Sequence, residues 1–273
     1  MSLDDVLKRF EWAEEQLLGL DTKLGALRRA YRDPPISVER KKGGKVREYS
    51  IGNVPKISRD LGLMVGDCLH NFRATIDNLA YTIATENNPA GLTSEERRAV
   101  SFPIADQRSD FRDARSKGVI AKLPARAQAR IQGMQPYKRG KEAQGHPLSV
   151  LKKLTDMDKH RTIPVVAWSV TPFAIDPAIP GARLTPLADE LVPNTKFLRL
   201  DLPAQYADMN VNVVLRFTVA IRGPETGGYR DASLWLGYIR TYIFETVVPR
   251  LAIYCPAATP ATVARARRLI WRG

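Results

Sequence analysis

The sequence predicts an α+β fold, in which long antiparallel helices are joined by a β-hairpin and packed with a C-terminal antiparallel sheet and a long C-terminal helix. Three observations predict it. Apolar residues recur every three or four positions in residues 2–31 and again up to about residue 86. Two strand-like runs flank Gly43-Gly44 between these stretches, and alternating runs dominate after residue 162. With 273 residues and 44% hydrophobic content, the chain can form one composite domain.

The N-terminal half begins with an expected helix over residues 2–31, which carries apolar positions from Leu3 to Leu27 and stops before Asp33-Pro34-Pro35. Residues 36–51 follow as a hairpin, because Gly43-Gly44 joins two β-rich runs. A second long helix begins after Asn53-Val54-Pro55, runs to about Glu86 and ends at Asn87-Asn88-Pro89. Residues 1–161 are therefore expected to be mainly helical.

The next segment is mixed. SFPI is a short extended piece, and residues 109–117 and 124–133 are expected to form short helices. Pro147 suits the first position of a helix that ends in Asp158-Lys159-His160-Arg161.

Residues 162–253 are expected to form a sheet followed by a helix. TIPVVAWSV, TKFLRLDLP and NVNVVLRFTVAIRG read as strands, and the hairpin-length turns between them favour antiparallel pairing. The helix from about residue 232 to 253 contains Pro249, which is expected to break it. A basic tail, residues 254–273, follows, with Thr262 as a predicted helix cap and a solvated, fraying end.

Composition limits the class of protein. No apolar run reaches the roughly 18 to 20 residues that span a bilayer, and the acidic, amphipathic start does not resemble a signal peptide, so a cytoplasmic protein without integral membrane association is expected. Cys68 and Cys255 are expected to be ordinary thiols. The sequence has no P-loop, Rossmann glycine pattern, G-x-S-x-G motif or zinc-type spacing, so no cofactor and no metal are predicted. The formal net charge of +13 favours phosphate-rich partners, either nucleic acid or anionic lipid, and a merely soluble surface is the third reading of that charge.

One face of the second long helix carries a set of polar side chains, which we call the polar stripe. At 100° per residue the apolar positions of residues 61–83 group on one side, and the stripe lies opposite with Arg73 at its edge. Asp, Asn and His are poorer helix formers than the Lys and Glu usual on solvent faces, so their presence favours a site or a buried hydrogen-bond network over a plain solvent face. The stripe consists of Asp67, His70, Asn71, Asp77, Asn78 and Tyr81.

The stripe offers a limited chemistry. His70 could exchange a proton near neutral pH, Asp77 could orient a neighbouring base, and Arg73 could hold a phosphate or an oxyanion. A plain intrahelical ion pair between Arg73 and Asp77 is the alternative reading of their spacing.

A second polar cluster lies at the end of the helix that begins at Pro147. It contains Asp156, Asp158, Lys159, His160 and Arg161, and can be read either as a charged helix C-terminus or as an anion clamp.

The strings GDCLHNFRATIDNLAY, SFPI, MQPY, HPLSVLKKL and DMDKHR resemble a widespread group of bacterial proteins of unknown function, common in actinobacteria. That group carries a pattern like G-[DE]-x-x-H-N-[LF]-R-x-x-[LI]-D-[HN]-L, followed by FPI, QPY and DKHR. The resemblance covers roughly residues 55–170 and implies membership without implying an activity.

A looser resemblance is to the HEPN superfamily, helical domains that often act as metal-independent ribonucleases in toxin and defence systems, frequently as dimers. Their hallmark is an arginine and a histidine separated by four to six intervening residues. Arg73 matches the arginine, but Asn78 stands where the histidine is expected, and an amide cannot act as a general acid or base. His70 or His160 would have to supply that proton transfer.

The leading hypothesis is a protein that binds RNA or another phosphate-bearing ligand. If it is an enzyme, the reaction is phosphodiester cleavage. The catalytic residues would be His70, Arg73, Asp77 and His160, and the ligand-binding residues Asp67, Asn71, Asn78, Tyr81, Lys159 and Arg161.

Several alternatives stay open. The two polar clusters could instead form one buried structural network in a non-catalytic interaction protein. A small-molecule module could use Trp168, Tyr229, Trp235 and Tyr238. The tail, with Arg265, Arg267, Arg268, Arg272 and Trp271, could touch nucleic acid or a membrane surface, and a homodimer is also open.

Overall fold

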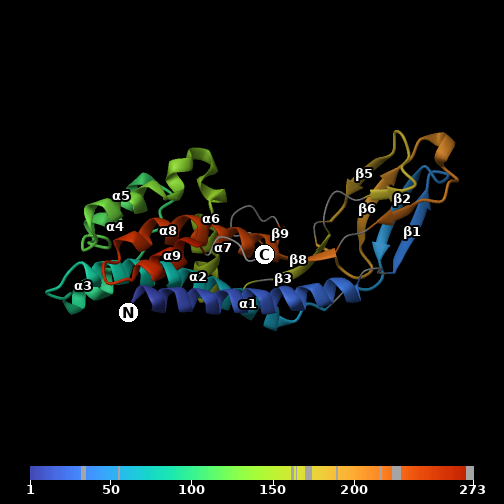
Figure 1. The fold of residues 1–273 in the computed structure, drawn as a ribbon. Helices are drawn as coiled ribbons and strands as arrows, with labels where there is room; N and C mark the ends of the chain where they lie inside the picture. The colour runs from blue at the N-terminus through green and yellow to red at the C-terminus, as the bar shows by residue number, and fades with distance from the viewer. Residues whose placement is uncertain are drawn as a thin grey trace. The chain divides into compact units, whose positions relative to one another are not determined.

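A computed structural model describes residues 1–31, 35–54, 56–160, 163, 165–169, 174–188, 190–214, 217–222 and 229–268; within these ranges, side chains 159, 160, 167–169, 174, 214, 217, 222, 267 and 268 are left aside. The predicted α+β class is confirmed (Figure 1). The chain divides into two compact units. Residues 1–18, 64–162 and 233–273 form the first, which we call the helical unit; residues 19–63 and 163–232 form the second, the sheet unit.

Two 28-residue helices, α1 (Leu3–Ala30) and α2 (Arg59–Glu86), form the predicted long pair. In the helical unit they meet through buried apolar side chains, with the ring centroids of Phe10 and Phe72 6.3 Å apart. Both helices match the expected ranges within three residues, because the apolar periodicity and the Asn-Asn-Pro stop are strong local signals.

Shorter helices surround this pair. The helix α3 was not predicted, although Thr93 and Glu96 form a complete capping box at its start. The helices α4, α5 and α6 lie where residues 109–117, 124–133 and 147–161 predicted them. The bounds are α3 (Ser94–Ala99), α4 (Arg108–Ser116), α5 (Ala125–Gly133), the 3₁₀ segment η1 (Pro136–Gly145) and α6 (Pro147–His160).

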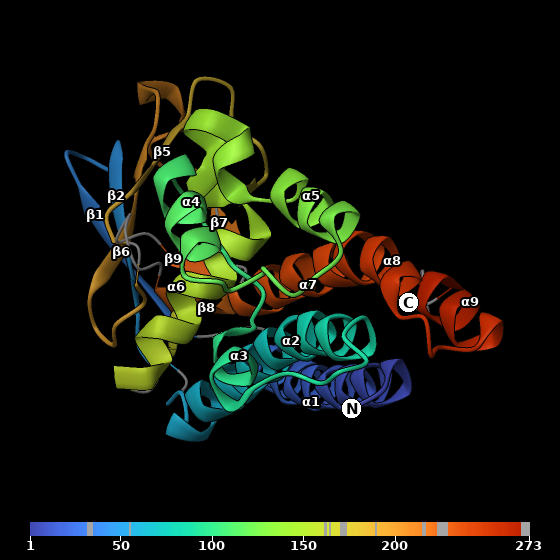
Figure 2. The ribbon, with the colours of Figure 1, turned by 90° about the vertical axis from the view of Figure 1, so that its left-hand side faces the viewer.

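The C-terminal helices pack within the helical unit. Arg240 donates a hydrogen bond to Glu14 of α1, and Tyr242 donates one to the Met134 carbonyl just after α5. Figure 2 shows α5 beside α8. The bounds are α7 (Ala232–Tyr242), the π-helical turn η3 (Ile243–Val247), α8 (Val248–Leu251), the 3₁₀ turn η4 (Ala252–Tyr254) and α9 (Pro260–Arg268).

Two expectations about this region need correction. Pro249 does not break the helix: a π turn precedes it, and helical backbone continues to Leu251. The cap of α9 is Thr259 rather than Thr262, since the Thr262 amide donates to the Thr259 hydroxyl while the Thr262 hydroxyl reaches Asp4. The tail is therefore helical to Arg268 and tied to α1, because Arg265 also bonds Glu11. Trp271 and Arg272 lie outside the described residues, as do the side chains of Arg267 and Arg268.

In the sheet unit the hairpin is confirmed as β1 (Ile36–Lys41) and β2 (Val46–Ile51), paired from Ile36 with Ile51 to Lys41 with Val46. Its turn requires glycine at position 44, which has φ +85° and would place a Cβ 2.5 Å from the Ala207 carbonyl oxygen. The hairpin is not isolated, because β2 also pairs with β6 (Lys196–Asp201).

Among the described residues the strands form three antiparallel sheets rather than the one expected. The first has the order β1-β2-β6-β5, with β5 at Arg183–Pro186. The run from residue 210 to 223 divides into β7 (Asn212–Val214) and β8 (Phe217–Arg222), which belong to different sheets. The second sheet has the order β3-β8-β9, with β3 (Val165–Ser169) and β9 (Tyr229–Asp231), and the third pairs β4 (Ala174–Asp176) with β7. A short 3₁₀ turn, η2 (Ala204–Tyr206), follows β6.

One face of the first sheet covers a core cluster that includes Tyr49, Ile51, Phe197, Leu198 and Leu200. Arg47 is also buried there, and its guanidinium donates to the carbonyls of Ala207 and Met209. The buried charge is thus held by two backbone acceptors in the segment after η2.

Candidate functional site

An open cavity of about 370 Å³ lies in the helical unit between α2 and α6. From α2, His70, Arg73 and Asp77 line it, at successive turns of one helix face. From α6, Lys152, Thr155 and Asp156 line it, again one turn apart. Ile104, from the extended SFPI segment, supplies an apolar part of the wall. The cavity therefore joins three of the predicted catalytic residues to the helix that carries the second polar cluster.

His70 and Asp158 form a hydrogen-bonded pair across α2 and α6. The His70 Nε2 atom lies 3.0 Å from the Asp158 Oδ2 atom. The imidazole is half exposed, whereas the carboxylate is 15% exposed. Asp158 of the second polar cluster is thus in contact with His70 of the polar stripe.

Gly66, one turn before His70 on α2, makes this approach geometrically possible. A Cβ atom at position 66 would lie 2.6 Å from Asp158 Oδ2 and 2.8 Å from Oδ1, well inside normal contact distance. The Asp158 carboxylate therefore occupies the space that any other residue at position 66 would fill.

Arg73 and Asp77 make a bidentate ion pair, with Nε to Oδ2 at 2.8 Å and the second guanidinium nitrogen to Oδ1 at 2.9 Å. Both partners also hold the backbone of Phe102. Arg73 donates to the Phe102 carbonyl oxygen at 2.8 Å, and the Phe102 amide donates to the Asp77 carboxylate at 2.9 Å. The pair is therefore a clamp on the SFPI segment. Among the described side chains Asp77 pairs with Arg73 and contacts no histidine, and Asp158 is the carboxylate that contacts His70.

Lys152 was not singled out from the sequence. Its side chain is half-buried in the cavity wall, and no carboxylate pairs with it among the described residues. Asp77 compensates Arg73, whereas Lys152 makes no ion pair with a described carboxylate, although Asp156 of the same lining lies one turn further along α6. Its position one turn before Asp156 on a helix with a recognisable start was the only signal that could have found it.

The other stripe residues are not part of the described cavity lining. Asp67 is exposed, and the Asn71 side-chain oxygen accepts a long hydrogen bond of 3.5 Å from Arg9. Asn78 and Tyr81 are half-buried on later turns of α2. These four residues keep their predicted role as ligand contacts only as a prediction.

The DKHR segment is described only in part. The α6 backbone extends to His160, but the side chains of Lys159 and His160, and the whole of Arg161, lie outside the described residues. Trp168, one of the four aromatics considered for a small-molecule pocket, has no described side chain either, while Tyr229 donates to Glu190 within the sheet unit.

His146 is a structural histidine. Its ring is buried, packs edge-on against Tyr242 at 4.6 Å between centroids, and accepts a hydrogen bond from the Leu148 amide at Nδ1. Burial, and secondarily the charge of Arg139, lowers the pKa of His146 to about 4. It is neutral at physiological pH and holds the start of α6, next to Pro147.

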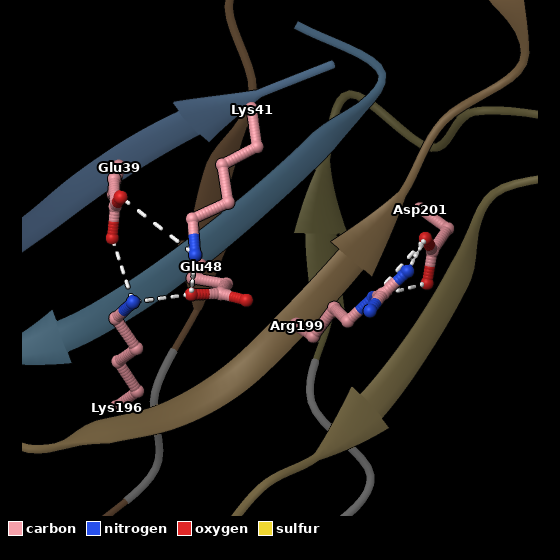
Figure 3. Close-up of polar contacts among 6 residues, drawn as sticks. All are labelled: Glu39, Lys41, Glu48, Lys196, Arg199 and Asp201. Carbon is pink, nitrogen blue, oxygen red and sulfur yellow. Dashed lines mark hydrogen bonds and ion pairs between the residues drawn. The ribbon is translucent and has the colours of Figure 1, made fainter.

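The other dense group of charges lies on the outer face of the first sheet (Figure 3). Lys41 and Lys196 each contact both Glu39 and Glu48, and Arg199 pairs with Asp201 on its own strand. Hydrogen bonds from Lys196 and then Lys41 lower the pKa of Glu48 to about 2. Hydrogen bonds to Glu39 and then Glu48 raise the pKa of Lys196. Three cations thus face three anions, so these six residues do not make an anion-binding surface.

Two further observations concern the described ranges alone. They contain no helix that is both long and apolar enough to cross a membrane. They also contain no cluster of three or more His, Cys, Asp or Glu side chains arranged to hold a metal ion.

Comparison with known proteins gave no matching family model, no matching curated protein and no matching solved structure. The resemblance to the bacterial group with the GDCLHN, FPI, QPY and DKHR strings stays a prediction, as does the looser one to HEPN domains. The residues of the cavity are therefore what bears on function.

Proposed function

We propose that the cavity between α2 and α6 binds a phosphate-bearing ligand, with RNA as the leading candidate. The observation that carries this proposal is that one open cavity is lined both by His70, which is half exposed and hydrogen-bonded to Asp158, and by Lys152, which pairs with no described carboxylate. A lysine ammonium binds phosphate oxygens as a compact point charge, and a net charge of +13 draws polyanions toward the protein.

Metal-independent cleavage of RNA is the reaction that these side chains suit. His70 would accept the proton of a ribose 2′-hydroxyl as the 2′-oxygen attacks phosphorus. The bond from phosphorus to the 5′-oxygen would break, leaving a 2′,3′-cyclic phosphate, and that 5′-oxygen would take a proton from water. Lys152 would stabilise the charge that develops on the phosphoryl oxygens. Arg73 would contribute from the cavity wall, but its main partners are Asp77 and Phe102.

The test uses the purified full chain, a fluorescently labelled single-stranded RNA, and two assays: fluorescence anisotropy for binding and gel analysis for cleavage. We expect Lys152→Ala to weaken binding by about tenfold, the typical contribution of a hydrogen bond to a charged group. Lys117→Ala, which removes an exposed lysine outside the described cavity lining, is the matched control and should bind as the wild type does.

His70→Ala separates binding from chemistry. We expect it to retain RNA binding while cleavage falls by at least about 10²-fold, the usual contribution of a general base. Cleavage that continues unchanged in His70→Ala would reject the enzymatic proposal. Absence of binding of RNA, mononucleotides and inorganic phosphate alike to the wild type would reject phosphate recognition altogether.

A second candidate function, a purely architectural role for the polar residues, is favoured by the contacts of Arg73 and Asp77. These side chains hold the Phe102 backbone and need no ligand to explain them. On this alternative, substitutions at position 73 or 77 would lower stability, and none of the cavity variants would change binding.

A further inference from the structure

The His70–Asp158 pair fixes which nitrogen of the imidazole can accept a proton. A carboxylate at neutral pH has no proton to donate, so the 3.0 Å contact requires hydrogen on Nε2 of His70. Neutral imidazole carries only one N–H, and Nδ1 is then left unprotonated. No other hydrogen bond to the His70 ring occurs among the residues that the structure describes.

The position of Asp158 depends in turn on Gly66. The carboxylate lies against the α2 backbone, with its Cγ 2.9 Å from the point where a Cβ at position 66 would lie. Glycine in a helix interior costs about 1 kcal/mol relative to alanine. Gly66 therefore destabilises its own helix but leaves room for the Asp158 carboxylate, which indicates that the position of this carboxylate matters.

We propose that Gly66 and Asp158 are positioning residues that hold His70 in the tautomer with hydrogen on Nε2, so that Nδ1 is the atom that accepts the proton from substrate. The consequence for catalysis rests on the proposed function, whereas the tautomer itself does not. Neither residue needs to touch the ligand: Asp158 acts through the imidazole and Gly66 acts through Asp158.

Substitution of Gly66 by alanine can separate positioning from folding. The displaced group is the end of a short side chain, so Asp158 can rotate away while α2 stays intact and gains alanine's better helix propensity. We therefore expect Gly66→Ala to fold with an unchanged or higher melting temperature and to lose the His70–Asp158 hydrogen bond. Gly237→Ala is the matched control, because it is a helical glycine of α7 whose added Cβ would meet open space.

Nitrogen-15 NMR of histidine-labelled full-length protein reads out the tautomer directly, and a His70→Gln variant assigns the His70 signals among the three histidines. At about pH 9, where imidazoles are neutral, wild type and Gly237→Ala should show a protonated Nε2 and an unprotonated Nδ1. Gly66→Ala and Asp158→Ala should both show a mixture of the two tautomers. A wild-type ring protonated on Nδ1, or an unaltered tautomer in Gly66→Ala and Asp158→Ala, would overturn the inference.

The activity of the same variants tests the link to catalysis. Misplacement of a reacting group by about 1 Å costs on the order of 10²-fold in rate, so RNA cleavage should fall by that factor in Gly66→Ala and Asp158→Ala while RNA affinity stays unchanged. If the tautomer behaves as expected and the wild type neither binds nor cleaves RNA, the proposed function fails and the positioning inference stands. If the tautomer result fails while cleavage still depends on His70, the positioning inference fails and the proposed function stands.

Discussion

Arg73 and Asp77, one turn apart on α2, both hydrogen-bond the backbone of Phe102: Arg73 donates to its carbonyl oxygen, and Asp77 accepts from its amide. An ion pair on a helix surface contributes only tenths of a kcal/mol. The additional bonds to the backbone give this pair a larger role, because removal of either partner leaves backbone groups and a charge to be satisfied elsewhere.

Substitution of Asp77 by alanine should therefore lower stability. We expect a loss of about 1–2 kcal/mol, since the Phe102 amide and the Arg73 guanidinium both lose an acceptor in a half-buried site. Urea denaturation followed by circular dichroism would measure it. Asp77→Asn should retain most of the stability, because the amide oxygen can still accept from Phe102. His70→Ala, which removes a half-exposed contact, should stay within about 0.5 kcal/mol of wild type.

Gln135 is expected to be a larger contributor to stability. Its buried side chain accepts from the Ala105 amide and donates to the carbonyls of Pro103 and Ile131. Gln135→Ala would leave three buried backbone groups without this partner, so we expect a loss on the order of 3 kcal/mol in chemical denaturation. Gln144→Ala, an exposed glutamine of η1, is the control and should be nearly neutral. Equal effects of the two variants would contradict the assigned role of Gln135.

The charged face of the first sheet predicts a dependence of stability on acid. The pKa of Glu48 is about 2 in the folded protein and 4.5 for an ordinary glutamate, so its contribution is fully present above pH 4.5 and is lost as pH falls toward 2. Denaturation at a series of pH values should show this decline. In Glu48→Gln the decline should be shallower, whereas Glu15→Gln, an exposed residue of α1, should keep the wild-type slope.

The two thiols should be inert in the folded protein. Both Cys68 and Cys255 are buried, and burial, with the nearby Glu86 carboxylate, raises the pKa of Cys255 to about 12. The reactive thiolate is therefore nearly absent from Cys255 at pH 8. Ellman's reagent should titrate neither cysteine in native buffer and both in urea. Rapid reaction of a thiol without denaturant would contradict the packing around these residues.

The sequence was most informative where a single periodic or capping signal decided the structure. The spacing from Leu3 to Leu27 and the Asn87-Asn88-Pro89 stop located α1 and α2, and Gly43-Gly44 located the hairpin. The alternation from Val211 to Ile221 was misleading, because period two shows only that residues are extended. It does not show that β7 and β8 belong to two different sheets.

The candidate site was only partly predictable for a similar reason. Helical geometry places His70, Arg73 and Asp77 on one face of α2, but it cannot say which carboxylate meets which base. An ion pair between Arg73 and Asp77 was one of the two readings of their spacing and is present, whereas the contact of Asp158, 88 residues away, with His70 was not predicted. That pairing depends on the approach of α6 to Gly66, a tertiary contact that no local pattern records.

The segment that carries Ile104 is fastened on both sides: Phe102 to α2, and Pro103 and Ala105 to Gln135. One wall of the cavity is therefore already immobilised before anything enters it. A ligand that docks against Ile104 does not have to order this backbone, so the conformational entropy that binding usually loses has been spent during folding. Affinity at this wall should consequently depend on shape and charge rather than on induced closure.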